Sequence, residues 1–269
     1  MITSTNKKYI MIVLLPIVVL AIALYGYKNK QHTTATYKPI ATTNIELPRL
    51  LAPQSEQVIA HEGYTVSYNS QWCIPNWVAY ELTADEVYGE VPRGDDFVPD
   101  PLAKGNTATT NDYKRSGYDR GHMVPAGDMK WSKTAMDESF YLSNICPQNK
   151  NLNKGDWKEL EELAREWAVE YGNIYIACGP IVANNYKTIG ENNVVVPESF
   201  FKVFLRDTGN RWTCIGFLFE NKAGNKKLNT YIRSIDEIEK LTGIDFFPLV
   251  PDDVEEKIES QTNVYEWKI

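Results

Sequence analysis

One histidine stands among residues that could together act on a phosphate ester. His122 closes the tetrad Asp119-Arg120-Gly121-His122, and the other two histidines of the chain are His32 and His61. A site built here has one imidazole, which suits a general base but cannot supply a multi-histidine metal cage. The guanidinium of Arg120 can pair with phosphate oxygens in a fixed bidentate geometry. These residue types indicate acid–base chemistry on an anionic substrate.

A second group of polar residues follows at helical spacing. Its members lie four apart, and they are Asn153, Trp157, Glu161 and Arg165. On a single helix that begins near Asn153, residues four apart form one slowly drifting row. An amide oxygen at the head of a helix, with a carboxylate two turns later, can hold a hard, largely hydrated cation such as Mg²⁺.

These residues resemble the motif of the DNA/RNA non-specific endonucleases. That motif combines a DRGH tetrad, an asparagine before a Pro-Gln pair, and Asn-x-x-x-Trp-x-x-Leu-Glu with an arginine four residues later. The chain carries each part in order, with Asn144 ahead of Pro147-Gln148, and the similarity runs from about Trp77 to Phe247. Several parts matching in register make a strong signal.

The resemblance implies a role for each matching residue. His122 takes a proton from the attacking water, Asn153 holds the cation directly, and Glu161 orders metal-bound water. Asn144 orients the site, while Asp119 is expected to fix the backbone of the tetrad. The arginines that bind substrate and offset the charge growing on the phosphate are Arg93, Arg120 and Arg165. The implied cofactor is Mg²⁺ or Mn²⁺, and the implied reaction cuts DNA and RNA to 5′-phosphorylated products.

Each residue also has an ordinary structural explanation. A single histidine is more often structural than catalytic, and Asn144 or Asn153 could simply cap a turn. Glu161 and Arg165 could form a surface helix pair worth a few tenths of a kcal/mol. The match of all of them to one family's order and spacing favours the functional interpretation.

Two other functions remain open on the sequence. One is a catalytically silent nucleic-acid-binding module tethered to a membrane, although such a module has no chemical need for His122 or Asn153. The other is a phosphodiesterase with a small-molecule or lipid substrate. The sequence is compatible with a monomer or a homodimer.

The chain divides into four parts. Residues 1–8 are a tail, and residues 9–27 are almost wholly apolar with lysines on both sides, close to the length that crosses a bilayer. A small-x-small pattern at Ala21-Ile22-Ala23 would allow a cleaved signal peptide and a secreted or periplasmic protein. Because that pattern lies inside the apolar run, we favour an uncleaved anchor with an exported catalytic domain. Residues 28–57 are rich in Thr and Pro and predict a linker before a domain over 58–269.

The domain is predicted to be α+β, with a largely antiparallel sheet flanked by helices. Runs of β-branched and aromatic residues predict strands. The predicted strands lie at Tyr64–Tyr68, Asn76–Leu82, the tetrad, Phe140–Leu142, Asn173–Cys178, Asn193–Val196, Phe200–Leu205 and Trp212–Phe219. Further helices are predicted at Ser234–Leu241 and Asp252–Glu259. The resemblance, rather than periodicity, supplies the name ββα-metal fold.

The net charge and the cysteine spacing each argue against one class of protein. A net charge of −7 argues against a protein that coats nucleic acid by bulk charge, but a local arginine cluster can still bind phosphate. The cysteines, which lack zinc-finger spacing, are Cys73, Cys146, Cys178 and Cys214. They allow three fully paired connectivities, and we favour buried thiols over disulfides.

Overall fold

The computed structural model describes residues 43–262 and 264–269 of the chain. The predicted tail, the predicted anchor at 9–27 and the first half of the predicted linker lie outside the described residues. Within the described residues, no helix is long and apolar enough to cross a membrane.

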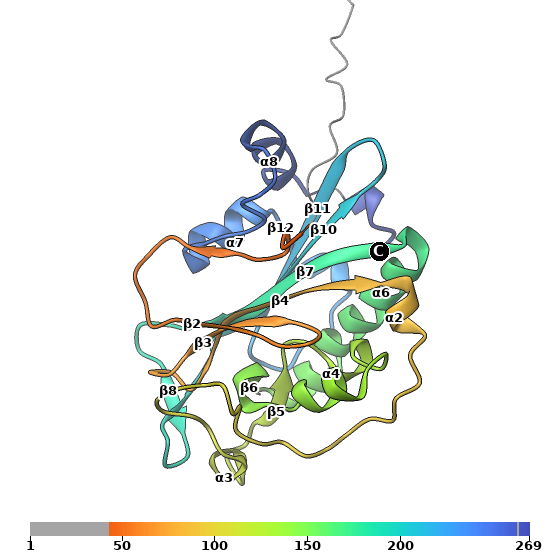
Figure 1. The fold of residues 1–269 in the computed structure, drawn as a ribbon. Helices are drawn as coiled ribbons and strands as arrows, with labels where there is room; N and C mark the ends of the chain where they lie inside the picture. The colour runs from red at the N-terminus through yellow and green to blue at the C-terminus, as the bar shows by residue number, and fades with distance from the viewer. Residues whose placement is uncertain (1–42, 263) are drawn as a thin grey trace, which may run out of the picture. The chain divides into compact units, whose positions relative to one another are not determined.

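A seven-stranded antiparallel sheet forms the centre of the domain, in the order β12-β11-β10-β7-β4-β3-β2 (Figure 1). Its strands are β2 (Gln57–Ala60), β3 (Thr65–Asn69), β4 (Ile74–Thr83), β7 (Asn173–Ile181), β10 (Ser199–Asp207), β11 (Trp212–Glu220) and β12 (Ile232–Arg233). Three two-stranded sheets pair β1 (Arg49–Leu50) with β13 (Ile244–Asp245), β5 (Asp119–His122) with β6 (Ile145–Gln148), and β8 (Lys187–Ile189) with β9 (Val194–Val196). The predicted α+β class with an antiparallel sheet is confirmed.

Both faces of the large sheet are covered. On one face, Phe200 and Phe204 of β10 contact Trp157 and Trp167, with ring centroids 5.6 and 5.2 Å apart. These tryptophans belong to the long helix α6 (Asp156–Tyr171), whose apolar stripe is buried as its spacing indicates. On the other face, Phe201 packs on Phe246 in the C-terminal part of the chain. Alternate residues of β10 therefore serve two different layers, which explains its continuous apolar run.

The other helices are short. They are α2 (Ala84–Val87), α3 (Thr110–Tyr113), α4 (Lys133–Glu138), α5 (Lys150–Lys154), α7 (Ile235–Thr242) and α8 (Asp252–Glu259). Helix α7 begins with the predicted capping box, in which Ser234 and Glu237 bond each other's backbone N–H groups. The predicted helix at Asp252–Glu259 is also confirmed.

One predicted strand is wrong. Phe140 follows the end of α4, and Leu142–Asn144 forms a 3-10 turn, so the strand that pairs with the tetrad begins only at Ile145. Phe140 and Leu142 are buried because they fill a core under a turn. A short apolar run does not reveal which of these two structures it will form.

The domain also begins earlier than residue 58. Ile45 is fully buried, and Arg49 forms an ion pair with Asp245 where β1 pairs with β13. The C-terminal part of the predicted linker thus contributes apolar surface and one short strand to the domain. All four cysteines are free and buried, as predicted.

Candidate active site

Strands β5 and β6 and helix α6 form a ββα unit on one face of the large sheet (Figure 1). Gly121 of β5 pairs with Cys146 of β6, and a Cβ atom at Gly121 would lie 2.4 Å from the Oε1 atom of the nearby Gln148 and 2.6 Å from its Cβ atom. Any larger residue would force the two strands apart. The glycine of the tetrad is therefore required by strand packing.

The backbone that follows the tetrad is fixed by side chains from two neighbouring elements. The Trp157 indole Nε1 donates to the His122 carbonyl oxygen at 3.3 Å. The Asn144 side chain accepts from the Val124 N–H at 2.9 Å and donates to the carbonyl oxygens of Val124 and Ser139. Asn144 is fully buried, and both the oxygen and the nitrogen of its amide form hydrogen bonds. It therefore positions the end of the strand that carries His122.

His122 lies in an aromatic pocket. Its ring is 5.3 Å from the ring of Phe97 and 5.0 Å from that of Phe140, and the residue is 8% exposed. Its buried Nε2 has no hydrogen-bond partner among the described residues. Burial, with smaller contributions from the nearby Arg93 and Arg120, lowers the pKa of His122 to about 3. The imidazole is therefore neutral at physiological pH, which is the form a general base requires.

Two of the predicted arginines cover this pocket. The Arg120 guanidinium lies over the Phe97 ring at 4.1 Å from its centroid, and that of Arg93 lies 5.2 Å from the centroid of Phe140. Both arginines are exposed, and each reaches the ring that contacts His122. The loop before residue 98 thus brings Arg93 close to the tetrad, as the resemblance implies.

Asn153 lies beside Arg120 in a cleft of about 560 Å³ that Phe97 and Asp119 also line. The Asn153 Nδ2 atom donates to the Asp119 carboxylate at 3.1 Å. This contact fixes the orientation of the amide and leaves its Oδ1 atom, which accepts no hydrogen bond from a described residue, as the available ligand atom. The expected role of Asp119 in fixing the tetrad backbone stays a prediction, and its carboxylate also orients Asn153.

The helix that was predicted to begin near Asn153 is interrupted. Asn153 belongs to α5, which ends at Lys154, and the backbone at Gly155 has φ −110° and ψ −113° before α6 begins. A Cβ atom at Gly155 would lie 2.6 Å from the Asn151 carbonyl oxygen. The break rotates Asn153 away from the row formed by Glu161 and Arg165, so it can face the tetrad.

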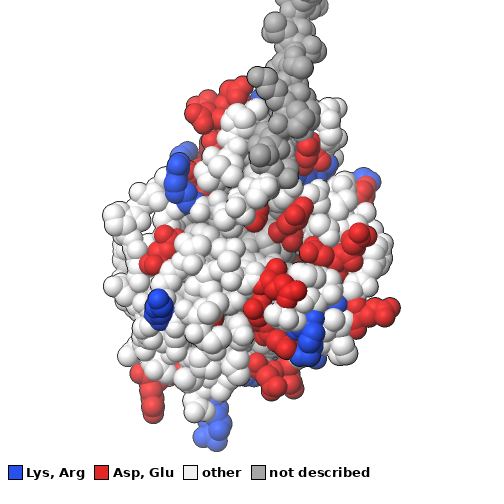
Figure 2. All heavy atoms as spheres, viewed as in Figure 1, with Lys and Arg blue, Asp and Glu red and all other residues white. Residues whose placement is uncertain are grey.

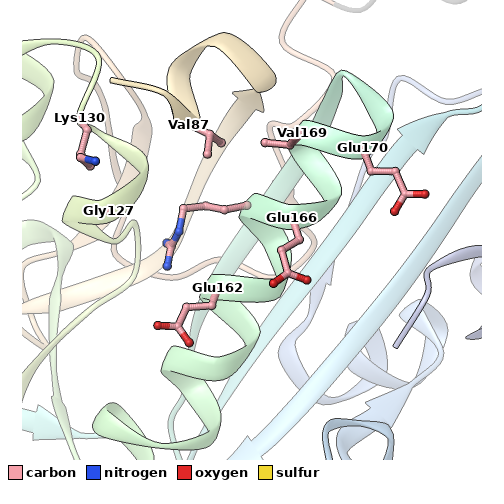
Figure 3. A pocket seen from close by; sticks show the side chains of 8 residues that line it. Val87, Gly127, Lys130, Glu162, Glu166, Val169 and Glu170 are labelled. Atoms are coloured by element: carbon pink, nitrogen blue, oxygen red, sulfur yellow. The ribbon is translucent and has the colours of Figure 1, made fainter. Parts of the chain in front are cut away.

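Glu161 and Arg165 belong to a buried charge cluster rather than to the cleft of Asn153. Arg165 forms a 2.7 Å ion pair with Asp128, whose side chain is almost fully buried. The pKa of Glu161 is raised to about 7, chiefly by burial, although the nearby Lys202 acts against this rise. Arg165 also borders a hollow between η1 (Ala126–Asp128) and α6, where Glu162 and Glu166 lie across from Lys130 (Figure 3).

Sequence reasoning missed Asp128 and Lys202. Lys202 is 1% exposed, lies 4.6 Å from the centroid of the Trp157 ring, and donates to the Met123 carbonyl oxygen at 3.4 Å. It therefore supports the same strand end as Trp157 and Asn144. The sequence pattern that could have pointed to Lys202 is a single lysine inside the otherwise apolar run Phe200–Leu205. A charge in such a run is costly to bury unless it has partners.

The lowered pKa of His122 predicts acid sensitivity of the fold. Between the unfolded pKa near 6.5 and the folded pKa of about 3, the unfolded chain binds a proton that the native chain does not. Stability should therefore fall as pH decreases through this window, by up to about 1.4 kcal/mol per pH unit from His122. Urea unfolding of the wild type and of His122→Gln at pH 7, 6 and 5 would measure the difference. Equal pH slopes for the two proteins would contradict this assignment.

The geometry defines a nuclease of the ββα-metal class. A solved structure described as the EndoG/EndoGI complex superposes with a TM-score of 0.70 and 29% sequence identity, covering 76% of this chain and 90% of that chain. The two chains therefore share the fold over most of their length.

Sequence comparison gives the family. The model of the DNA/RNA non-specific endonucleases matches residues 42–253. Mitochondrial nuclease EXOG of Mus musculus is 35% identical over 206 residues, which cover 70% of this chain but 56% of the mouse protein. Mitochondrial endonuclease G of Homo sapiens is 32% identical over 218 residues, which cover 76% of this chain and 73% of the human protein. The chain belongs to the DNA/RNA non-specific endonuclease family.

Proposed function

We propose that this protein is a metal-dependent endonuclease that hydrolyses phosphodiester bonds of DNA and RNA to 5′-phosphorylated products. One observation carries the proposal. Two exposed arginines cover a neutral His122, whose Nε2 has no hydrogen-bond partner in the described part of the chain, next to a cleft that contains an oriented Asn153 amide. Family membership supports the same conclusion.

His122 would act as the general base. Its neutral imidazole accepts a proton from the attacking water, a contribution worth about a hundred- to ten-thousand-fold in rate. Arg120 and Arg93 bind the phosphate from the rim of the cleft, and they offset the charge that grows on its oxygens. Since the two guanidinium groups rest on Phe97 and Phe140, the aromatic rings set their positions relative to His122.

The residues present fit a hard divalent cation. Asn153 Oδ1 would hold Mg²⁺ or Mn²⁺, because an amide oxygen with open solvent around it suits a cation that keeps most of its water. When bound, such a cation supplies Lewis-acid stabilisation of a phosphate oxygen and of the leaving oxygen.

Glu161 and Arg165 act from the buried charge cluster. We assign Glu161 the ordering of water near the cleft. Arg165 positions that carboxylate, since each of these groups influences the pKa of the other. The ion pair with Asp128 reduces the charge that Arg165 can offer a phosphate, so Arg120 and Arg93 are the stronger candidates for substrate binding.

The direct test is incubation of the full chain with supercoiled plasmid and with RNA, with Mg²⁺ or with EDTA. We expect nicking and linearisation of the plasmid and degradation of the RNA, in both cases only with the divalent cation. Binding without cleavage would identify a silent binding module. Cleavage of a small or lipid phosphodiester with no action on either polymer would identify a different phosphodiesterase.

We also propose that residues 9–27 anchor the enzyme in a membrane and that the domain lies on the exported side. Fractionation of cells that express the full chain, followed by carbonate extraction and protease accessibility, tests this arrangement. Release of a shortened soluble protein would instead support a cleaved signal peptide.

Light scattering of the detergent-purified chain distinguishes a monomer from a homodimer.

Substrate affinity should depend only moderately on salt. On the face shown in Figure 2, Lys and Arg are scattered among Asp and Glu and form no continuous band. Binding by a few arginines should give a slope of log affinity against log salt of about −2 to −4 on duplex DNA, because each phosphate contact contributes about −0.9. Fluorescence anisotropy with catalytically inactive protein across a salt series measures this slope. A slope near −9 would contradict the small-patch model.

A further inference from the structure

A second cluster of carboxylates lies outside the candidate active site, where helix α7 meets the end of helix α8. Oxygen atoms of Asp236, Glu239 and Glu259 all lie within 4.8 Å of one another. Asp236 and Glu239 project from the first two turns of α7, and Glu259 is the last residue of α8. Figure 2 shows acidic side chains gathered in the region where Figure 1 places α8.

Burial separates this cluster from an ordinary acidic surface. Glu259 is 3% exposed, and its Oε1 atom has no hydrogen-bond donor among the described residues. A buried carboxylate oxygen normally has a donor or a cation as its partner. A carboxylate oxygen of Glu259 lies within 4.8 Å of carboxylate oxygens of Asp236 and Glu239, which offer no protons when ionised.

Two cations near this cluster are exposed, and one of them already has a partner. Arg49 forms an ion pair with Asp245, and the exposed Lys240 is the positive group that influences Glu239. Burial, followed by Glu239 and other neighbouring carboxylates, raises the pKa of Glu259 to about 10. At pH 8 this raised pKa keeps a proton on Glu259, and a bound divalent cation would displace that proton as it takes up the buried oxygen.

We propose that Asp236, Glu239 and Glu259 form a calcium site that cross-links α7 to α8. Ca²⁺ takes oxygen ligands at about 2.3–2.6 Å, so ligands on opposite sides of one ion are up to about 5.2 Å apart. The three carboxylates lie within that span. Mg²⁺ keeps several of its waters, which suits a buried Glu259 poorly, and the absence of His or Cys from the set argues against zinc.

The site is distinct from the nuclease centre. The Cys214 thiol of β11 donates to the Ile258 carbonyl oxygen at the end of α8, and Cys214 pairs with Leu205 of β10. In β10, residues 201 and 205 face the opposite side of the sheet from Phe200 and Phe204, which pack on α6. The calcium would stabilise the layer that covers this second face, and its binding does not depend on the proposed catalysis.

The test begins with the full chain carrying Asn153→Ala, which removes the proposed catalytic cation ligand. Calorimetric titration of the metal-stripped protein with CaCl₂ at pH 8 should show one site with a dissociation constant below about 1 mM. Thermal unfolding should shift upward by about 5–10 °C at calcium a hundredfold above that constant. No binding in this range would overturn the proposal.

Matched variants in the same background locate the site. Glu259→Gln should abolish both the calcium heat and the thermal shift. Its unfolding temperature without calcium should stay close to that of the parent, because a neutral amide replaces a carboxyl group that is itself protonated at pH 8. Glu256→Gln, on the exposed side of α8, should leave both signals unchanged. If Glu259→Gln folds poorly, Asp236→Asn provides the same comparison. Calcium binding that survives either site variant would place the ion elsewhere and overturn the proposal.

Discussion

Replacing His122 by Ala should lower the rate of DNA and RNA cleavage by about a hundred- to ten-thousand-fold, the usual contribution of a positioned general base. The variant keeps Asn153, Arg120 and Arg93, so cation and nucleic-acid binding should remain close to wild type. Single-turnover cleavage at saturating protein, combined with anisotropy binding, separates the chemical step from binding.

Two further variants make the His122 result specific. His122→Gln keeps more of the buried volume between Phe97 and Phe140, so a shared loss of rate in both variants points to the base and not to a cavity. Asn111→Ala changes an exposed residue of the same cleft and should retain wild-type activity. Wild-type cleavage by His122→Ala would refute the proposed mechanism.

Replacing Asn153 by Ala should also abolish cleavage at low Mg²⁺, but through loss of the cation. Its apparent Mg²⁺ affinity should fall by more than the about 10- to 100-fold typical of a residue that only orients a ligand. High Mg²⁺ should therefore restore part of the rate, which it cannot do for His122→Ala. Rate measured against Mg²⁺ concentration for both variants provides this comparison.

The contact between Asp119 and Asn153 gives an internal check on this prediction. Asp119→Ala leaves the ligand amide in place but removes its partner, so the loss of Mg²⁺ affinity should fall within the about 10- to 100-fold range. Glu161→Gln should act more mildly than Asn153→Ala. Asn151 is an exposed residue of α5, the helix that carries Asn153, so the Mg²⁺ dependence of Asn151→Ala should match that of the wild type. An unchanged Mg²⁺ dependence in Asn153→Ala would remove Asn153 from the cation site.

The sequence was enough to predict the family and most of the elements. Residue types limited the site to one imidazole, arginines and an amide, because no second histidine lies near His122 along the chain. Runs of β-branched and aromatic residues predicted the main strands, and the Ser-x-x-Glu pattern predicted α7, since both signals are local in the sequence. The buried environment of the cysteines also followed from their apolar neighbours.

Only the tertiary structure decided how these parts meet. The break at Gly155 depends on a backbone geometry that helical spacing cannot reveal, and it moves Asn153 out of the row of Glu161 and Arg165. The pairing of Arg165 with Asp128, and the support that Lys202 gives to Met123, join residues 37 and 79 positions apart. The neutral state of His122 likewise depends on Phe97 and Phe140, because desolvation is a property of the packed site and not of the local sequence.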